Sequence, residues 1–149
     1  KAGRNVLALR TFSKIYGLAG LRIGYGITTP EIAELMNKVR QPFNTNSPAQ
    51  AAALAALGDR KHVEKSIAVN NEGKQFLYQS FQRLGVSYVP TETNFILFET
   101  SVDGRELYGA LLKAGVIIRP MGGRKLRVTI GLPEENKRFV SELEKIVKA

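Results

Sequence analysis

The sequence predicts an α/β fold in which helices cover a small sheet. Two observations predict it. From residue 86 onward the chain alternates strand, strand, helix, strand, strand, helix. About 44% of the 149 residues are hydrophobic, which is enough for a sizeable core. The first 40 residues are richer in glycine and lack long helices, so we assign residues 1–40 to the end of one domain. Residues 41–149 then form a C-terminal small domain that includes long connecting helices.

The N-terminal part predicts two strands and a helix. Residues 5–9 form a short apolar run with the length of a buried strand, and residues 23–27 form a second candidate strand. Glycines punctuate residues 16–26, which permits tight turns and close backbone approach. A helix is expected to begin at the Thr29 cap and to end before Pro42.

Two further helices are expected in the middle of the chain. Ser47 opens a capping box with proline at the first helical position, and the alanine-rich helix that follows ends at Gly58. Asp59 can cap a long helix over residues 60–84, where apolar residues recur at helical spacing. Gly85 is the expected stop signal of this helix.

The C-terminal part predicts four strands and two helices. The expected strands are residues 86–89, 94–98, 116–119 and 126–130. Asp103 caps a helix that ends at Gly115, and Pro133 starts the final helix. Pro120 is expected to close the third strand, followed by a loop over residues 121–124.

Composition excludes several classes of function. The net charge is +9, but the 22 basic residues are interleaved with 13 acidic ones and no block of five like charges occurs. With no zinc-finger or RNA-binding signature, we expect arginines aimed at small anions rather than a nucleic-acid interface. No apolar run approaches the roughly 20 residues of a membrane helix, so no membrane partner is expected. Without cysteine and with one histidine, His62, we expect no metal site, and His62 is interpreted as a solvated surface residue.

The residues that point to chemistry are Thr11, Ser13, Lys14 and Arg22, in glycine-rich surroundings after the first strand. Hydroxyls and a guanidinium donate hydrogen bonds to phosphate. A partly desolvated lysine near another cation has its neutral amine favoured, and a neutral amine can attack an aldehyde. Pyridoxal phosphate requires such a phosphate site beside a nucleophilic lysine. A serine followed by a lysine is common, however, and by itself has no such meaning.

The whole string Arg-Thr-Phe-Ser-Lys-x-x-x-Leu-Ala-Gly-x-Arg-x-Gly-Tyr, residues 10–25, resembles the lysine motif of class I and II aminotransferases of fold type I. The resemblance implies that Lys14 holds pyridoxal 5′-phosphate as a Schiff base. It also implies that Arg22 binds the cofactor phosphate, with help from the hydroxyls of Thr11 and Ser13. Residues 1–40 would then be the last strands of the large cofactor-binding domain.

A second set of residues resembles the substrate site of histidinol-phosphate aminotransferases. Arg119 and Arg127 lie in the segments Ile118-Arg-Pro120 and Leu126-Arg-Val-Thr-Ile-Gly131. The resemblance implies that both arginines lie near the substrate phosphate, which suits bidentate pairing of arginine with an anion. Asn94, in Thr91-Glu-Thr-Asn-Phe95, belongs to the same pattern. It is either a substrate contact or a strand-end residue that bonds to backbone.

The resemblance implies a transamination between histidinol phosphate and 2-oxoglutarate in histidine biosynthesis, by a cytoplasmic homodimer. Two alternatives stay open: a threonine-phosphate decarboxylase or other class I/II aminotransferase, and an aminotransferase-like sensor domain of a transcription regulator. The resemblance covers only the C-terminal part of such an enzyme. The phosphate-binding turn, the ring-stacking aromatic and the aspartate for the pyridine nitrogen are implied to lie before Lys14. We therefore expect a fragment that does not transaminate alone.

Overall fold

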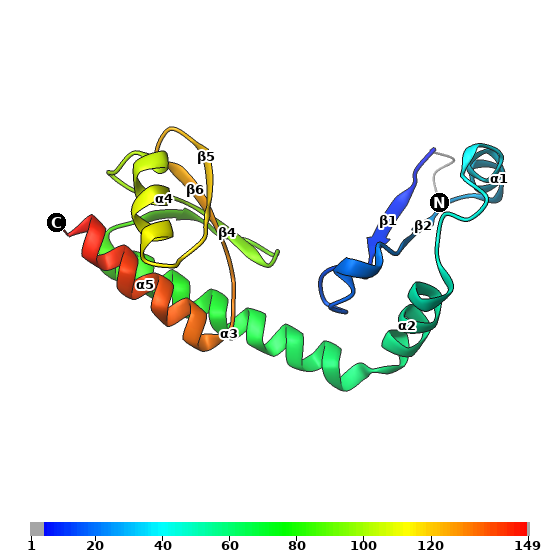
Figure 1. The fold of residues 1–149 in the computed structure, drawn as a ribbon, viewed down its shortest axis with the longest axis horizontal. Coiled ribbons are helices and arrows are strands. Elements are labelled where there is room, and N and C mark those ends of the chain that lie inside the picture. Colours follow the sequence, from blue (N-terminus) through cyan, green and yellow to red (C-terminus); the bar gives the residue numbers. More distant parts are fainter. Residues whose placement is uncertain (1–4, 149) are drawn as a thin grey trace. The chain divides into compact units, whose positions relative to one another are not determined.

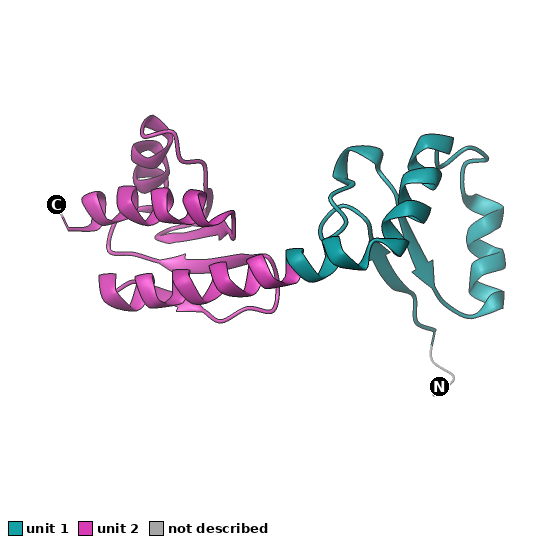
Figure 2. Cartoon of the chain, turned by 90° about the horizontal axis from the view of Figure 1, so that it is seen from below, with its two compact units in different colours: residues 1–66 teal, residues 67–149 magenta. Residues whose placement is uncertain are grey.

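The computed structural model describes residues 5–148, and these residues form five α-helices and six β-strands (Figure 1). The prediction of an α/β fold is therefore confirmed. The chain divides into two compact units, Lys1–Ser66 and Ile67–Ala149 (Figure 2). The domain boundary after residue 40 stays a prediction, and the first four residues of that domain lie outside the described residues. Within the described part of the chain, no helix combines the length and apolarity needed to cross a bilayer.

Unit 1 contains an antiparallel ribbon of β1 (Ala8–Thr11) and β2 (Gly24–Ile27), in which Thr11 lies opposite Gly24. The prediction of a buried strand at residues 5–9 was wrong in both extent and burial. Residues 5–7 precede the strand, and Leu9 is 68% exposed on the two-stranded ribbon.

Two helices of unit 1 lie where the sequence predicts them. They are α1 (Pro30–Val39) and α2 (Ser47–Gly58), and a short 3-10 helix, η1 (Ala19–Leu21), precedes β2. The cap of α2 differs from the prediction: Asn46 rather than Ser47 occupies it. The Asn46 side chain accepts a hydrogen bond from the Ala49 N–H at 2.8 Å, which satisfies one of the free amides at the helix start.

Unit 2 contains a four-stranded antiparallel sheet in the order β3-β4-β6-β5. Its strands are β3 (Ser87–Val89), β4 (Phe95–Glu99), β5 (Arg119–Gly122) and β6 (Lys125–Thr129). The helices α4 (Gly104–Lys113) and α5 (Pro133–Val147) pack with the C-terminal part of α3 (Arg60–Leu84).

The core of unit 2 covers one face of this sheet. Side chains alternate along a strand, so Ile96 and Phe98 of β4 share a face with Leu126 and Val128 of β6. All four are buried, and they pack against apolar residues of the three helices, which are Leu77, Phe81, Leu107, Leu111, Phe139, Val140 and Leu143. The alternate residues of β4 and β6 therefore point to the opposite face.

The capping signals in this part of the chain are confirmed. Asp59 accepts from the His62 N–H at 3.0 Å, and Asp103 accepts from the Arg105 N–H at 2.9 Å. Gly85 and Gly115 both adopt the positive φ of a helix stop, at 68° and 76°.

The third strand of the sheet was predicted wrongly. Pro120 does not close it but lies inside β5, opposite Leu126. Proline is tolerated there because β5 is an edge strand, where a missing N–H costs no ladder bond. The loop expected at residues 121–124 shrinks to a turn at residues 123–124, and Gly122 at the end of β5 and Gly123 in the turn both have positive φ.

Candidate functional site

The lysine predicted to carry the chemistry lies in the connection between β1 and β2. Phe12 begins this connection and is buried, with its ring 4.9 Å from that of Tyr16 and 5.8 Å from that of Tyr25. The Phe12 N–H donates to the Ile23 carbonyl at 3.2 Å, and the Leu18 N–H donates to the Phe12 carbonyl at 3.0 Å. Phe12 therefore anchors both ends of the segment that carries Lys14.

Lys14 lies on a tight turn within this anchored segment. The Gly17 N–H donates to the Lys14 carbonyl at 2.9 Å, and Gly17 has a φ of +70°, which favours glycine. Before the turn, the Ser13 N–H donates to the Thr11 hydroxyl oxygen at 3.0 Å. Lys14 is exposed, and its amine has no hydrogen bond or ion pair among the described residues. The amine is thus open to an incoming group.

Arg22 lies at the other end of the connection in a rare backbone conformation. Its φ of 54° and ψ of 45° are left-handed, which is uncommon for a residue other than glycine, and such residues cluster at functional sites. Its Nη1 donates to the Ala19 carbonyl at 2.8 Å, while its other guanidinium N–H groups have no partner among residues 5–148. Those groups can donate to an anion.

His62 has a role that the sequence did not reveal. The side chain is exposed, as predicted, but its Nε2 lies 3.0 Å from the carbonyl oxygen of Ile15, the residue after Lys14. A carbonyl accepts, so the imidazole carries its proton on Nε2 in this contact. The two residues are 47 positions apart, and no local pattern could have paired them.

The two predicted substrate arginines are direct neighbours in unit 2. Arg119 of β5 lies opposite Arg127 of β6, so both belong to one face of the sheet. Because Arg127 stands between the buried residues Leu126 and Val128, this face is the one turned away from the core. Like charges directly opposite one another are destabilising. An anion bound between the two arginines would relieve that repulsion.

The Arg127 side chain has an unsatisfied buried donor. Its Nε is buried and has no hydrogen-bond partner among the described residues. Its guanidinium carbon lies 4.8 Å from the centre of the Phe95 ring, a cation–π contact that holds the group in place. A buried donor without a partner costs free energy, and such a group is a candidate for ligand binding.

Asn94 lies one residue before β4. Its carbonyl oxygen accepts a hydrogen bond from the Ile130 N–H at 2.9 Å, which continues the β4–β6 ladder. Within residues 5–148, no hydrogen bond to its side-chain amide is found. The strand-end bond of Asn94 is thus made by its backbone carbonyl. A substrate contact of its side chain stays a prediction.

Comparison with known proteins places this chain in a family. The sequence model described as "Aminotransferase class I and II" matches residues 1–143. The chain belongs to the class I and II aminotransferases. The family resemblance of the lysine motif is therefore confirmed, and the fold agrees, because solved aminotransferase structures match nearly the whole chain.

Among similar aminotransferases, the histidinol-phosphate aminotransferase of Moorella thermoacetica is 53% identical over 152 residues, covering 99% of this chain and 39% of that protein. That of Symbiobacterium thermophilum is 51% identical over 144 residues, covering 94% of this chain and 40% of that protein. The crystal structure of the histidinol-phosphate aminotransferase of Sinorhizobium meliloti, in complex with pyridoxal-5′-phosphate, matches with a TM-score of 0.89. It is 30% identical, and the match covers 96% of this chain and 41% of that one. The chain thus spans about 40% of the length of these relatives.

The residues of unit 1 fit the phosphate end of pyridoxal phosphate. The set Thr11, Ser13, Arg22 and Lys14 supplies hydroxyl and guanidinium donors beside a primary amine, all at one end of the β1–β2 ribbon. This donor set suits a phosphate, and the amine suits an aldehyde. Arg119 and Arg127 lie in unit 2, and there they form a candidate anion-binding pair of their own.

Proposed function

We propose that this chain is the C-terminal part of a pyridoxal-phosphate-dependent aminotransferase that moves an amino group between histidinol phosphate and 2-oxoglutarate. A phosphorylated amino donor is inferred chiefly from Arg127, whose Nε is buried without a partner among the described residues and which lies opposite Arg119 in the sheet. The sequence identity of 51–53% to histidinol-phosphate aminotransferases supports the choice of amino donor.

Pyridoxal phosphate, when bound, supplies an electron sink for the substrate carbon that loses its proton. Lys14 would hold the cofactor through its side-chain amine, and the same amine would accept and return the proton of the substrate carbon. The exposed position of Lys14 on a tight turn supports both roles, because it leaves the amine accessible.

The remaining residues bind and orient. Thr11, Ser13 and Arg22 would donate hydrogen bonds to the cofactor phosphate, with Arg22 placed at the end of η1. Arg127 and Arg119 receive the phosphate of the amino donor. Planar guanidinium groups bind phosphate with paired hydrogen bonds, which gives orientation as well as attraction.

A screen of amino donors on the full-length protein tests this proposal. With 2-oxoglutarate as acceptor, histidinol phosphate should give the highest kcat/KM. Equal or faster turnover of aspartate or of an aromatic amino acid would contradict the substrate assignment. Carbon dioxide release from phosphothreonine would favour the decarboxylase instead. The decarboxylase structure from Porphyromonas gingivalis matches at 23% identity, which shows the shared fold alone.

The wider setting is also part of the proposal. We expect a cytoplasmic homodimer that binds an amino donor and a 2-oxo acid, without a nucleic-acid partner. Sedimentation of the full-length protein would test the dimer. DNA binding without turnover would instead support the regulator alternative.

A further inference from the structure

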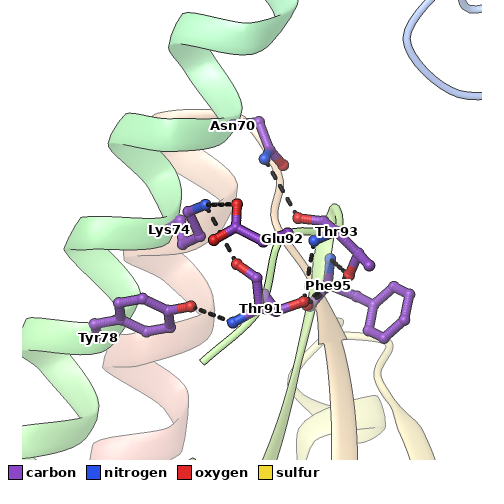
Figure 3. Close-up of polar contacts among 7 residues, drawn as sticks. All are labelled: Asn70, Lys74, Tyr78, Thr91, Glu92, Thr93 and Phe95. Carbon is purple, nitrogen blue, oxygen red and sulfur yellow. Dashed lines mark hydrogen bonds and ion pairs between the residues drawn. The ribbon is translucent and has the colours of Figure 1, made fainter. Parts of the chain in front are cut away.

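The turn between β3 and β4 is attached to α3, and two of the hydrogen bonds are made to Thr91 (Figure 3). The Tyr78 hydroxyl oxygen accepts a hydrogen bond from the Thr91 N–H at 2.7 Å. The Lys74 ammonium donates to the Thr91 carbonyl at 3.3 Å. Because residues four apart share one side of a helix, α3 presents both groups to the same peptide segment. Both backbone polar groups of Thr91 are therefore bound by α3.

The same side of α3 also contacts the turn through Asn70. Asn70 lies four residues before Lys74, and its amide donates to the Thr93 carbonyl at 3.4 Å (Figure 3). Within the turn, the Thr93 N–H donates to the Thr91 hydroxyl oxygen at 3.1 Å. Residues 91–93 are therefore held both by bonds within the turn and by bonds to the helix.

Lys74 is a poor choice for stability alone. The residue is 9% exposed, and its ion-pair partner Glu92, at 3.6 Å, has a fully exposed side chain. Desolvation of a buried ammonium offsets much of its attraction to a carboxylate, and water screens the exposed partner. What Lys74 supplies is a directed hydrogen bond to Thr91, which fixes the geometry of the turn.

The turn leads directly into the substrate site. Asn94 ends it, and its carbonyl holds the end of β6 through the Ile130 N–H. Phe95 follows, and the Arg127 guanidinium lies over its ring at 4.8 Å. A shift of the turn would move the Phe95 ring, and with it the surface on which Arg127 rests.

We infer that Lys74 and Tyr78 are positioning residues of the substrate site. They fix Thr91, and through it Asn94 and Phe95. Arg127, which rests on the Phe95 ring, thereby keeps the orientation that binds the substrate anion. Neither residue touches the substrate in this account. The inference rests on the proposed function, because it takes Arg127 as the anion-binding group.

The test compares histidinol phosphate with histidinol as amino donors of the full-length enzyme. Tyr78→Phe keeps the ring that stacks on Tyr88 at 4.6 Å but removes the hydroxyl acceptor, and Lys74→Met keeps the buried stem without the charge. Each should reduce the preference for the phosphorylated donor about tenfold, through a higher KM with little change in kcat. Tyr88→Phe is the matched control, since the Tyr88 hydroxyl bonds to Gln82 at 3.1 Å, and it should keep the preference.

Arg127→Lys in the same assay separates this inference from the proposed function. A reduced preference in Arg127→Lys, with wild-type preference in both Tyr78→Phe and Lys74→Met, would overturn the positioning role alone. Unchanged preference in Arg127→Lys would overturn the role of Arg127 and the inference together. A variant that only unfolds at a lower temperature while keeping its preference would also count against positioning.

Discussion

Replacing Arg127 by lysine is the substitution for which the structure gives the clearest expectation. Lysine keeps the positive charge but lacks the Nε–H, which is buried and has no partner among the described residues. If that donor binds the substrate anion, the variant loses one charge-assisted hydrogen bond, worth about 1.5–3 kcal/mol. One factor of ten corresponds to about 1.4 kcal/mol, so kcat/KM for histidinol phosphate should fall about 10- to 150-fold.

Steady-state kinetics of the full-length enzyme measures this effect. Arg124→Lys is the control, because Arg124 lies in the turn before β6 and forms an exposed ion pair with Glu99 at 3.2 Å. Exposed pairs contribute little, so Arg124→Lys should change kcat/KM less than about twofold. Equal effects of the two substitutions would refute the role of the Arg127 Nε–H, because the loss would then not depend on that buried donor.

Three further predictions concern the stability of unit 2, measured in the full-length protein. Arg83 and Lys148 lower the pKa of Glu144 to about 2 from its ordinary 4.5, so the stability from this carboxylate is present above pH 4.5 and lost as the pH falls toward 2. The melting temperatures of wild type and Glu144→Gln should therefore converge over that range, and a constant difference would contradict the assignment. Phe98→Ala removes a ring that is 1% exposed, so it should lower the protection of β6 amides against hydrogen exchange by about 3–5 kcal/mol. A loss below about 1 kcal/mol would contradict the buried position of Phe98 in the core. Asn136→Ala removes two 2.9 Å hydrogen bonds to the backbone of Gly131, so it should lower the protection of β6 amides by about 2–4 kcal/mol. Unchanged hydrogen exchange would show that water replaces these two bonds.

Local chemistry explains why most helices could be predicted from the sequence. The bounds of α3 follow from a capping aspartate at Asp59 and a glycine stop at Gly85, which act within a few residues. The cap of α2 was predicted one residue too late, at Ser47 instead of Asn46, because either side chain can cap a helix. The prediction of a strand at residues 116–119 was wrong for a different reason. The alternating apolar residues Val116 and Ile118 have the pattern of a strand and are buried in the core. They have no partners in the sheet, however, and pairing begins only at Arg119.

The candidate site shows the same limit. Candidate residues could be named from the sequence, because the lysine motif is contiguous and the two arginines lie in short segments that resemble the family; their roles stay predictions. The spatial relations could not be predicted, because they depend on pairing between distant strands and helices. The register that places Arg119 opposite Arg127 and the reach of His62 to Ile15 appear only in the folded chain. The attachment of Thr91 to α3 is of the same kind, since it joins residues 13 and 17 positions apart on different elements.

Chemical trapping of the cofactor tests the central claim most directly. The full-length protein is incubated with pyridoxal phosphate, reduced with borohydride to fix any imine, digested and analysed by mass spectrometry. We predict that the phosphopyridoxyl group is found on Lys14, is lost in Lys14→Ala and is kept in Lys38→Ala, which removes a lysine from α1. A label on another lysine, or a label that persists unchanged in Lys14→Ala, would contradict the account.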